Sequence, residues 1–246
     1  IVKAFKDHRL KECCRPIVIG DAQLLRATAA RFAPGLSIRT LAMVEDSVTN
    51  DNVLEVIDLH NVPENLPMGR ASAEGGKASV QYIRTAVDLA MQHRVTAITT
   101  APINKEGIHL AGHIYPGHTE LLAEYTGVLD YALMMAGGKL RVVLGTTHVA
   151  LKDVRALLTQ EKIAGTISLT NRWLSQHVTE TPRIAVTGLN PHCGDGGIFG
   201  EEESEIIIPA IELARSEGIG VEGPFSADAL FPRAKSGEYD AVITMY

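Results

Sequence analysis

Histidine and lysine side chains stand directly after several apolar runs of the sequence, where they could do chemistry. His148 follows the run "LRVVLGTT", and His192 lies in the glycine-rich stretch "GLNPHCGDGG" after the run "RIAV". Lys105 follows "TAITTAPIN" in the same way. In sheets of parallel strands, ligands bind at the carboxyl ends of the strands. We therefore expect Lys105, His148 and His192 to lie near a ligand site.

The loop around His192 is compatible with a metal site, a phosphate site or a plain turn. Asn190 precedes a proline and is held extended, and the glycines after His192 let the backbone pass close to a ligand. A neutral imidazole suits a divalent metal, whereas the successive N–H groups of "CGDGG" could cradle an anion. The three consecutive acids at 201–203 would repel a phosphate, which favours the metal.

Three further candidates have a plain structural explanation beside a functional one. His148 could be a half-buried histidine that bonds only to backbone. In "YPGHTELLAEY", Thr119 could cap a helix, or His118 and Thr119 could hold an anionic group at the helix N-terminus. Asp228 in "SADALF" fits a helix cap. From these residues alone, the alternatives stay open.

Composition and missing motifs exclude several classes of protein. The chain has 246 residues, 46% of them hydrophobic, and a net charge of −6. This is enough for one large or two smaller domains, and it argues against a nucleic-acid partner. No apolar stretch is long enough to span a membrane. Three cysteines, two of them adjacent, form no disulfide framework, which favours a reducing cytoplasm. The phosphate-binding P-loop, the Rossmann glycine motif and the serine-hydrolase elbow are absent.

Apolar periodicity predicts strands that alternate with helices, and therefore an α/β fold with largely parallel sheets. We expect a first domain at 1–116 and a second at 117–246. The chain begins within an apparent helix and ends on an apolar run, so we interpret it as an internal segment of a longer protein. The expected strands are 16–20, 36–44, 53–59, 96–101, 131–136, 140–147, 183–189 and 240–246, and the expected helices are 21–32, 73–93, 119–126, 160–177 and 201–217.

Four long motifs resemble one family. "TAPINKEGIHLAGHIYPGHTELLAEYTG", "TTHVALKDV", "GLNPHCGDGGIFGEEE" and "GPFSADALF" with "YDAVITMY" are similar to the 4-hydroxythreonine-4-phosphate dehydrogenase family, which includes relatives acting on D-threonate and D-erythronate 4-phosphates. The resemblance covers nearly the whole chain. It implies two α/β/α domains with an isocitrate/isopropylmalate-dehydrogenase-like fold. It also implies a homodimer with its active site in the cleft between the domains.

The resemblance also implies roles for individual residues. His148 and His192 match two of three metal ligands, and the third would directly follow Tyr246. His118 and Thr119 match residues that contact the substrate. Asp228 matches an acid near the site. The catalytic proton acceptor is not identified by any motif, and Lys105 and Asp228 are the candidates for it. The cofactor-binding residues are not identified either.

The activity implied is oxidation of the C3 hydroxyl of a 4-phosphorylated four-carbon acid, followed by decarboxylation. Hydride would pass to NAD or NADP, with a divalent ion of Zn, Co, Mn, Ni or Mg at the histidines. The protein would be a cytoplasmic homodimer that binds neither nucleic acid nor membrane. Two alternatives remain: a metal-dependent lyase or hydrolase on the same acids, and a non-catalytic relative that binds phosphorylated metabolites.

Overall fold

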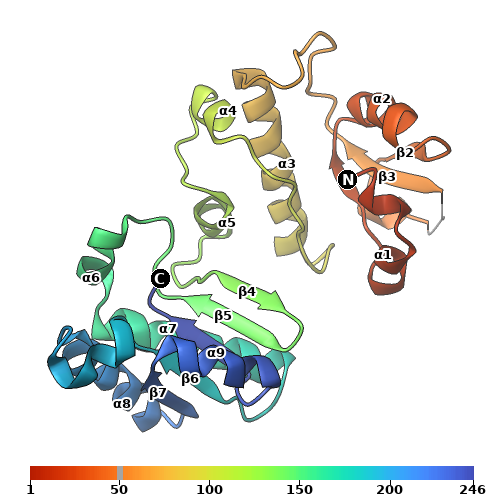
Figure 1. The fold of residues 1–246 in the computed structure, drawn as a ribbon. Helices are drawn as coiled ribbons and strands as arrows, with labels where there is room; N and C mark the ends of the chain where they lie inside the picture. The colour runs from red at the N-terminus through yellow and green to blue at the C-terminus, as the bar shows by residue number, and fades with distance from the viewer. Residues whose placement is uncertain (49–51) are drawn as a thin grey trace. The chain divides into compact units, whose positions relative to one another are not determined.

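The computed structural model describes residues 1–48 and 52–246, and these form two compact units, Ile1–Gly127 and Val128–Tyr246 (Figure 1). Both units combine helices with sheets whose strands run mostly parallel. The expected α/β class is therefore confirmed. No helix in the described ranges has the length and apolar character needed to cross a bilayer.

The first unit contains a parallel sheet with the strand order β1-β3-β2. Its strands are β1 (Val18–Gly20), β2 (Ser37–Leu41) and β3 (Val53–Asp58). Helix α2 (Ala22–Phe32) begins where expected, because the Asp21 carboxylate accepts a hydrogen bond from the Leu24 N–H at 3.0 Å. The small side chains of α2 pack in one cluster with Leu54 and Val56 of β3.

Helices complete the first unit. They are α1 (His8–Cys13), α3 (Ala73–Met91), α4 (Lys105–Leu110) and α5 (His118–Thr126), with short 3-10 turns at Ala4–Lys6 and Val44–Asp46. Leu121 of α5 packs against Ile83 and Val87 of α3. This contact places α5 in the first unit, which extends to Gly127. The domain boundary at 116/117 stays a prediction.

The strand expected at 96–101 is not formed, so this prediction was wrong. A strand needs a partner for its backbone groups, and the described residues provide none beside this segment. Its apolar character has another cause, since Ile98 packs against the cluster of Ile83, Val87 and Leu121.

The second unit is built on a five-stranded sheet with the order β4-β5-β8-β6-β7. Strand β4 (Met134–Gly137) runs antiparallel to β5, and the other neighbours are parallel. The remaining strands are β5 (Leu140–Leu144), β6 (Ile184–Thr187), β7 (Val221–Phe225) and β8 (Ala241–Thr244). The helices and turns are Leu151–Asp153, α6 (Val154–Leu157), α7 (Gln160–His177), Pro191–Gly197, a π-helical turn at Glu203–Ile207, α8 (Ile208–Ser216) and α9 (Ala227–Ser236).

Helices cover both faces of this sheet. Successive side chains of a strand point to opposite faces. Ile184 of β6 is fully buried in the cluster that contains the apolar face of α7 and α8, whereas the next residue, Ala185, packs with Leu230 and Ala234 of α9. The second unit is therefore an α/β/α sandwich.

Among the elements of the second unit that were not predicted, strand β7 and helix α9 each contain a proline. Strand β7 contains Pro224, which argues against a central strand, but β7 lies at the sheet edge, where proline is tolerated. Helix α9 contains Pro232 in its interior, which ordinarily breaks a helix. Burial of Leu230 and Ala234 against the sheet outweighs this cost.

A buried carboxylate in the first unit should make its stability depend on pH. Glu55 of β3 accepts hydrogen bonds from the Val48 N–H at 2.8 Å, from Ser47 and from Arg39. Burial raises the pKa of Glu55, but these three donors together outweigh burial and hold that pKa below its ordinary value. Because the folded pKa is lowered, the stabilisation is complete above the ordinary pKa of about 4.3 and is lost as the pH falls through the folded pKa.

We therefore expect Glu55→Gln to lower the free energy of unfolding by about 1–3 kcal/mol at pH 7, with a smaller difference from wild type at pH 3. Urea unfolding at the two pH values measures this. Glu45→Gln is the control, because Glu45 pairs with Arg94 at the surface and should matter little. An equal loss at both pH values would contradict the role given to the Glu55 charge.

Candidate active site

The strand order of the second unit brings the loops of His148 and His192 to the same edge of the sheet. His148 follows β5 and His192 follows β6, and both strands run parallel to β8, which lies between them. Their carboxyl ends therefore lie side by side, with the end of β8 in the middle. The His148 loop is bonded directly to that end, since Gly145 N–H donates to the Thr244 carbonyl at 2.7 Å and the Thr146 hydroxyl donates to the Met245 carbonyl at 2.8 Å.

Both histidines have a left-handed backbone, with φ of 55° at His148 and 52° at His192. This conformation is uncommon for a residue other than glycine and costs about 1–3 kcal/mol, so it persists only where the surroundings enforce it. His60 and His93 share it, with φ of 44° and 57°. A left-handed backbone therefore does not by itself distinguish His148 and His192 from the other histidines. Their position at the carboxyl ends of the strands does distinguish them.

The loop after β6 turns in a left-handed sense over five consecutive residues, from His192 to Gly196. Left-handed runs of this kind are unfavourable for L-residues. Backbone bonds close the turn: Cys193 N–H donates to the Asn190 carbonyl at 3.1 Å, and Phe199 N–H donates to the Gly194 carbonyl at 3.0 Å. The sequence predicted a permissive loop here, but not this conformation.

The acids that follow the loop do not act as the sequence suggested. We expected residues 201–203 to repel an anion at a helix start. Instead, Glu203 is buried, and its carboxylate accepts hydrogen bonds from the Leu189 and Asn190 N–H groups, each at 2.8 Å. Glu202 accepts from the Asn190 side chain at 2.8 Å. These two acids support the loop of His192, a role for which the sequence has no signal.

Asp228 lies in the first turn of α9, exposed to solvent. A hydrogen bond from the Ser226 hydroxyl lowers the pKa of Asp228, and the Ala229 N–H and the nearby His192 lower it further. The two candidates His192 and Asp228 are therefore close enough to interact. A carboxylate with a lowered pKa is a weak base, which favours a charged partner for a cation over a proton acceptor.

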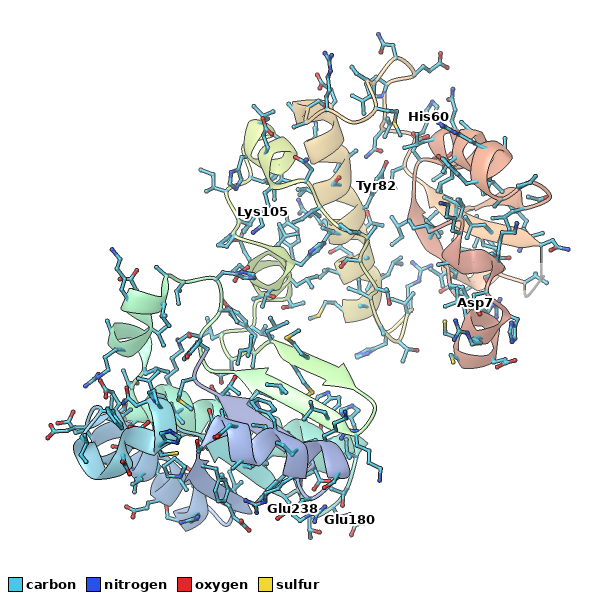
Figure 2. All side chains as sticks on the ribbon, in the orientation of Figure 1. Asp7, His60, Tyr82, Lys105, Glu180 and Glu238 are labelled. Atoms are coloured by element: carbon cyan, nitrogen blue, oxygen red, sulfur yellow. The ribbon has the colours of Figure 1, made fainter. Side chains whose placement is uncertain are left out.

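The remaining candidates lie in the first unit. Lys105 is the exposed first residue of α4, whose N-cap Asn104 accepts from the Gly107 N–H at 2.7 Å (Figure 2). His118 and Thr119 are the first two residues of α5, and Gly117 occupies the N-cap position, so the capping role considered for Thr119 was wrong. The Nε2 atom of His118 is buried and has no hydrogen-bond partner among residues 1–48 and 52–246. Buried polar atoms are almost always paired, so a ligand partner fits this atom.

A polar cluster that the sequence analysis did not single out lies at the carboxyl ends of β1 and β3. The Asp58 carboxylate accepts from the Ala22 N–H at 3.0 Å, and the Tyr82 hydroxyl of α3 donates to Asn61 at 2.8 Å (Figure 2). Burial, and then the charges of Asp21 and Asp58, raise the pKa of Tyr82 to about 12. Tyr82 therefore stays protonated and joins α3 to the loop after β3.

His148 and His192 suit a divalent metal by the type of their donor atoms. A metal site also needs a complete set of ligands. Over residues 1–48 and 52–246, no three His, Cys, Asp or Glu side chains gather closely enough to hold an ion. The two histidines therefore fit such a metal in chemistry, but within this chain they do not complete its coordination.

Several known proteins are similar to this chain over its whole length. The D-threonate 4-phosphate dehydrogenase of Cupriavidus necator is 41% identical over 247 residues, which cover 100% of this chain and 74% of the relative. The 4-hydroxythreonine-4-phosphate dehydrogenase of Trichlorobacter lovleyi is 43% identical over 251 residues, which cover 100% of this chain and 75% of the relative.

A crystal structure of a 4-hydroxythreonine-4-phosphate dehydrogenase from Burkholderia phymatum matches with a TM-score of 0.90 and 41% identity, over 100% of this chain and 74% of that one. The expected family and the dehydrogenase class of enzyme are both confirmed. The family described as pyridoxal phosphate biosynthetic protein PdxA matches residues 12–246. This chain belongs to the PdxA family.

Proposed function

We propose that the protein oxidises the C3 hydroxyl of a 4-phosphorylated four-carbon acid and transfers hydride to NAD or NADP. The substrate is 4-hydroxy-L-threonine 4-phosphate, D-threonate 4-phosphate or D-erythronate 4-phosphate. The observation that carries the proposal is the position of His148 and His192 on either side of β8, in a chain whose relatives are named for two of these acids. The oxidised acid has a keto group beta to its carboxylate, and such acids lose CO₂ readily, so decarboxylation follows.

In this proposal, His148 and His192 hold a divalent ion of Zn, Co, Mn, Ni or Mg through neutral imidazole nitrogens. When bound, such an ion acts as a Lewis acid that lowers the pKa of a coordinated hydroxyl. The ionised Asp228 near His192 adds negative charge, which favours a cation at this edge.

The candidates of the first unit bind and orient the substrate. His118 and Thr119 stand at the N-terminus of α5, where free N–H groups and the helix dipole favour an anion. The unpaired Nε2 of His118 supports this role. Lys105 is a candidate proton acceptor, and its exposed ammonium group could equally bind a substrate anion. Asp228 is the other candidate, although its lowered pKa makes it the weaker base.

We also propose that the protein works as a homodimer in the cytoplasm, without nucleic-acid or membrane partners. The net charge of −6 disfavours binding to a polyanion.

An assay of NADH absorbance with each of the three acids tests the proposed function in the complete protein. We expect NADH and CO₂ to form in equal amounts with at least one acid, and a chelator to abolish both. Consumption of an acid without NADH, in the presence of metal, would instead indicate a lyase or hydrolase. Binding without consumption would indicate a non-catalytic relative.

A further inference from the structure

The carboxylate of Glu203 fills the interior of the loop that carries His192. Glu203 is only 5% exposed. Its Oε1 atom accepts the N–H groups of Leu189 and Asn190, each at 2.8 Å. A Cβ atom added at Gly188 would lie 2.8 Å from Glu203 Oε1, and one added at Gly194 would lie 2.9 Å from Glu203 Oε2. The carboxylate therefore touches the backbone on both sides of His192.

Asn190 connects this carboxylate, through Glu202, to helix α6. Its side-chain Nδ2 donates one hydrogen to Glu203 Oε2 at 3.0 Å and the other to Glu202 Oε2 at 2.8 Å. Arg155 of α6, in the segment after His148, donates from Nε to Glu202 Oε1 at 3.1 Å. A continuous network of hydrogen bonds thus joins the loop of His192 to helix α6, which follows His148 in the chain.

The backbone around Glu203 is as unusual as the loop that it supports. Glu203 begins a π-helical turn that continues to Ile207, directly before α8. Such turns are rare and occur frequently at functional sites. The turn is anchored by Ile206 and Ile207, which are buried in the core with α7. Glu203 therefore connects the His192 loop to the core of the unit. This connection can hold a left-handed backbone that is unfavourable by itself.

We propose that Glu203 is a positioning residue whose carboxylate holds the His192 loop in the conformation that binds the metal. The inference rests on the proposed function, because it gives His192 the role of a ligand. Partners outside the ligand shell commonly change metal affinity about 10–100-fold when they are removed. Glu203 should act in this way, because it contacts the loop backbone on both sides of His192 and is not itself a ligand.

Glu203→Gln in the complete protein tests the proposal with little change of shape. The new amide oxygen can still accept the two backbone N–H groups, but its NH₂ group faces the NH₂ group of Asn190, which also donates. We expect affinity for Co²⁺, titrated into the apoprotein and followed by absorbance, to fall about tenfold or more. Hydrogen exchange should accelerate in the segment 188–199 and stay unchanged in α7.

Glu205→Gln is the matched control. It removes the same charge from the same turn, but the Glu205 side chain is 55% exposed and pairs with Arg155 at 3.4 Å. Co²⁺ affinity and hydrogen exchange should stay at wild-type values. Equal losses in both variants would mean that charge acts through space, and this would overturn the positioning role. Wild-type affinity and exchange in Glu203→Gln would also overturn it.

Two further measurements keep the test decisive. If Glu203→Gln does not fold, Asn190→Ala removes only the donor between the two carboxylates, and it should still weaken Co²⁺ binding measurably. If wild-type protein binds no Co²⁺ and His192→Ala changes nothing, the proposed function fails. Hydrogen exchange of the segment 188–199 then decides by itself whether Glu203 holds the loop.

Discussion

Replacing His192 by alanine is expected to lower divalent-metal affinity and turnover by at least about 100-fold. This is the upper end of the loss caused by removing a residue that only supports a metal ligand. In the proposed function His192 supplies a nitrogen ligand at the carboxyl ends of the strands beside β8, and alanine supplies none. The side chain is exposed within this chain, so its loss removes little packing and the fold should persist. His148→Ala should behave in the same way. Co²⁺ titration of the apoprotein, circular dichroism and the NADH assay measure the three effects.

His93→Ala is the matched control for this experiment. His93 has a comparable left-handed backbone, with φ of 57°, and its side chain is also exposed. Alanine therefore meets the same backbone strain at both positions, but only the His192 variant loses a predicted ligand. If His192→Ala turned over substrate at the wild-type rate, the metal assignment would be wrong. If His93→Ala were equally impaired, alanine at a left-handed position, and not ligand loss, would be the cause.

Replacing Gly76 by alanine is expected to destabilise the first unit by about 3 kcal/mol, the upper end of overpacking costs. Gly76 lies in α3 where α4 crosses it. A Cβ atom at this position would lie 1.9 Å from the carbonyl oxygen of Gly107 and 2.8 Å from the Ile108 nitrogen. These are backbone atoms of α4, so relief requires the two helices to separate. Urea unfolding and hydrogen exchange in α3 and α4 measure the loss.

If Lys105 takes part in the proposed reaction, turnover should fall as well, because Lys105 is the first residue of α4. Gly165→Ala is the control: Gly165 lies inside α7, and nothing stands within 4 Å of an added Cβ atom. There the higher helix propensity of alanine should raise stability by about 0.5–1 kcal/mol. Unchanged stability in Gly76→Ala would show that α3 and α4 do not pack as closely as described.

Local patterns were sufficient for most elements of both units. Apolar runs predicted β1, β2, β3, β5, β6 and β8. A buried strand needs apolar side chains, and this requirement is visible in a few consecutive residues of the sequence. Helices α2 and α3 begin close to their expected starts, where Asp21 and Ser72 accept backbone N–H groups. The same local logic failed for 96–101, β7 and α9. Pairing partners and sheet position decide the structure of these segments, and both depend on distant residues.

By itself, the sequence determined that His148 and His192 each follow a strand, because strand ends and glycine-rich loops are local features. It also determined the family, through motifs spread over the chain. Only the tertiary structure decided that β8 inserts between β5 and β6 and so places the two loops on either side of its end. The bond between Thr146 and Met245, 99 positions apart, belongs to that arrangement. The tertiary structure also decided that the Glu203 carboxylate is buried and that His192 has a left-handed backbone. Each is unfavourable alone and is stabilised by contacts from other segments.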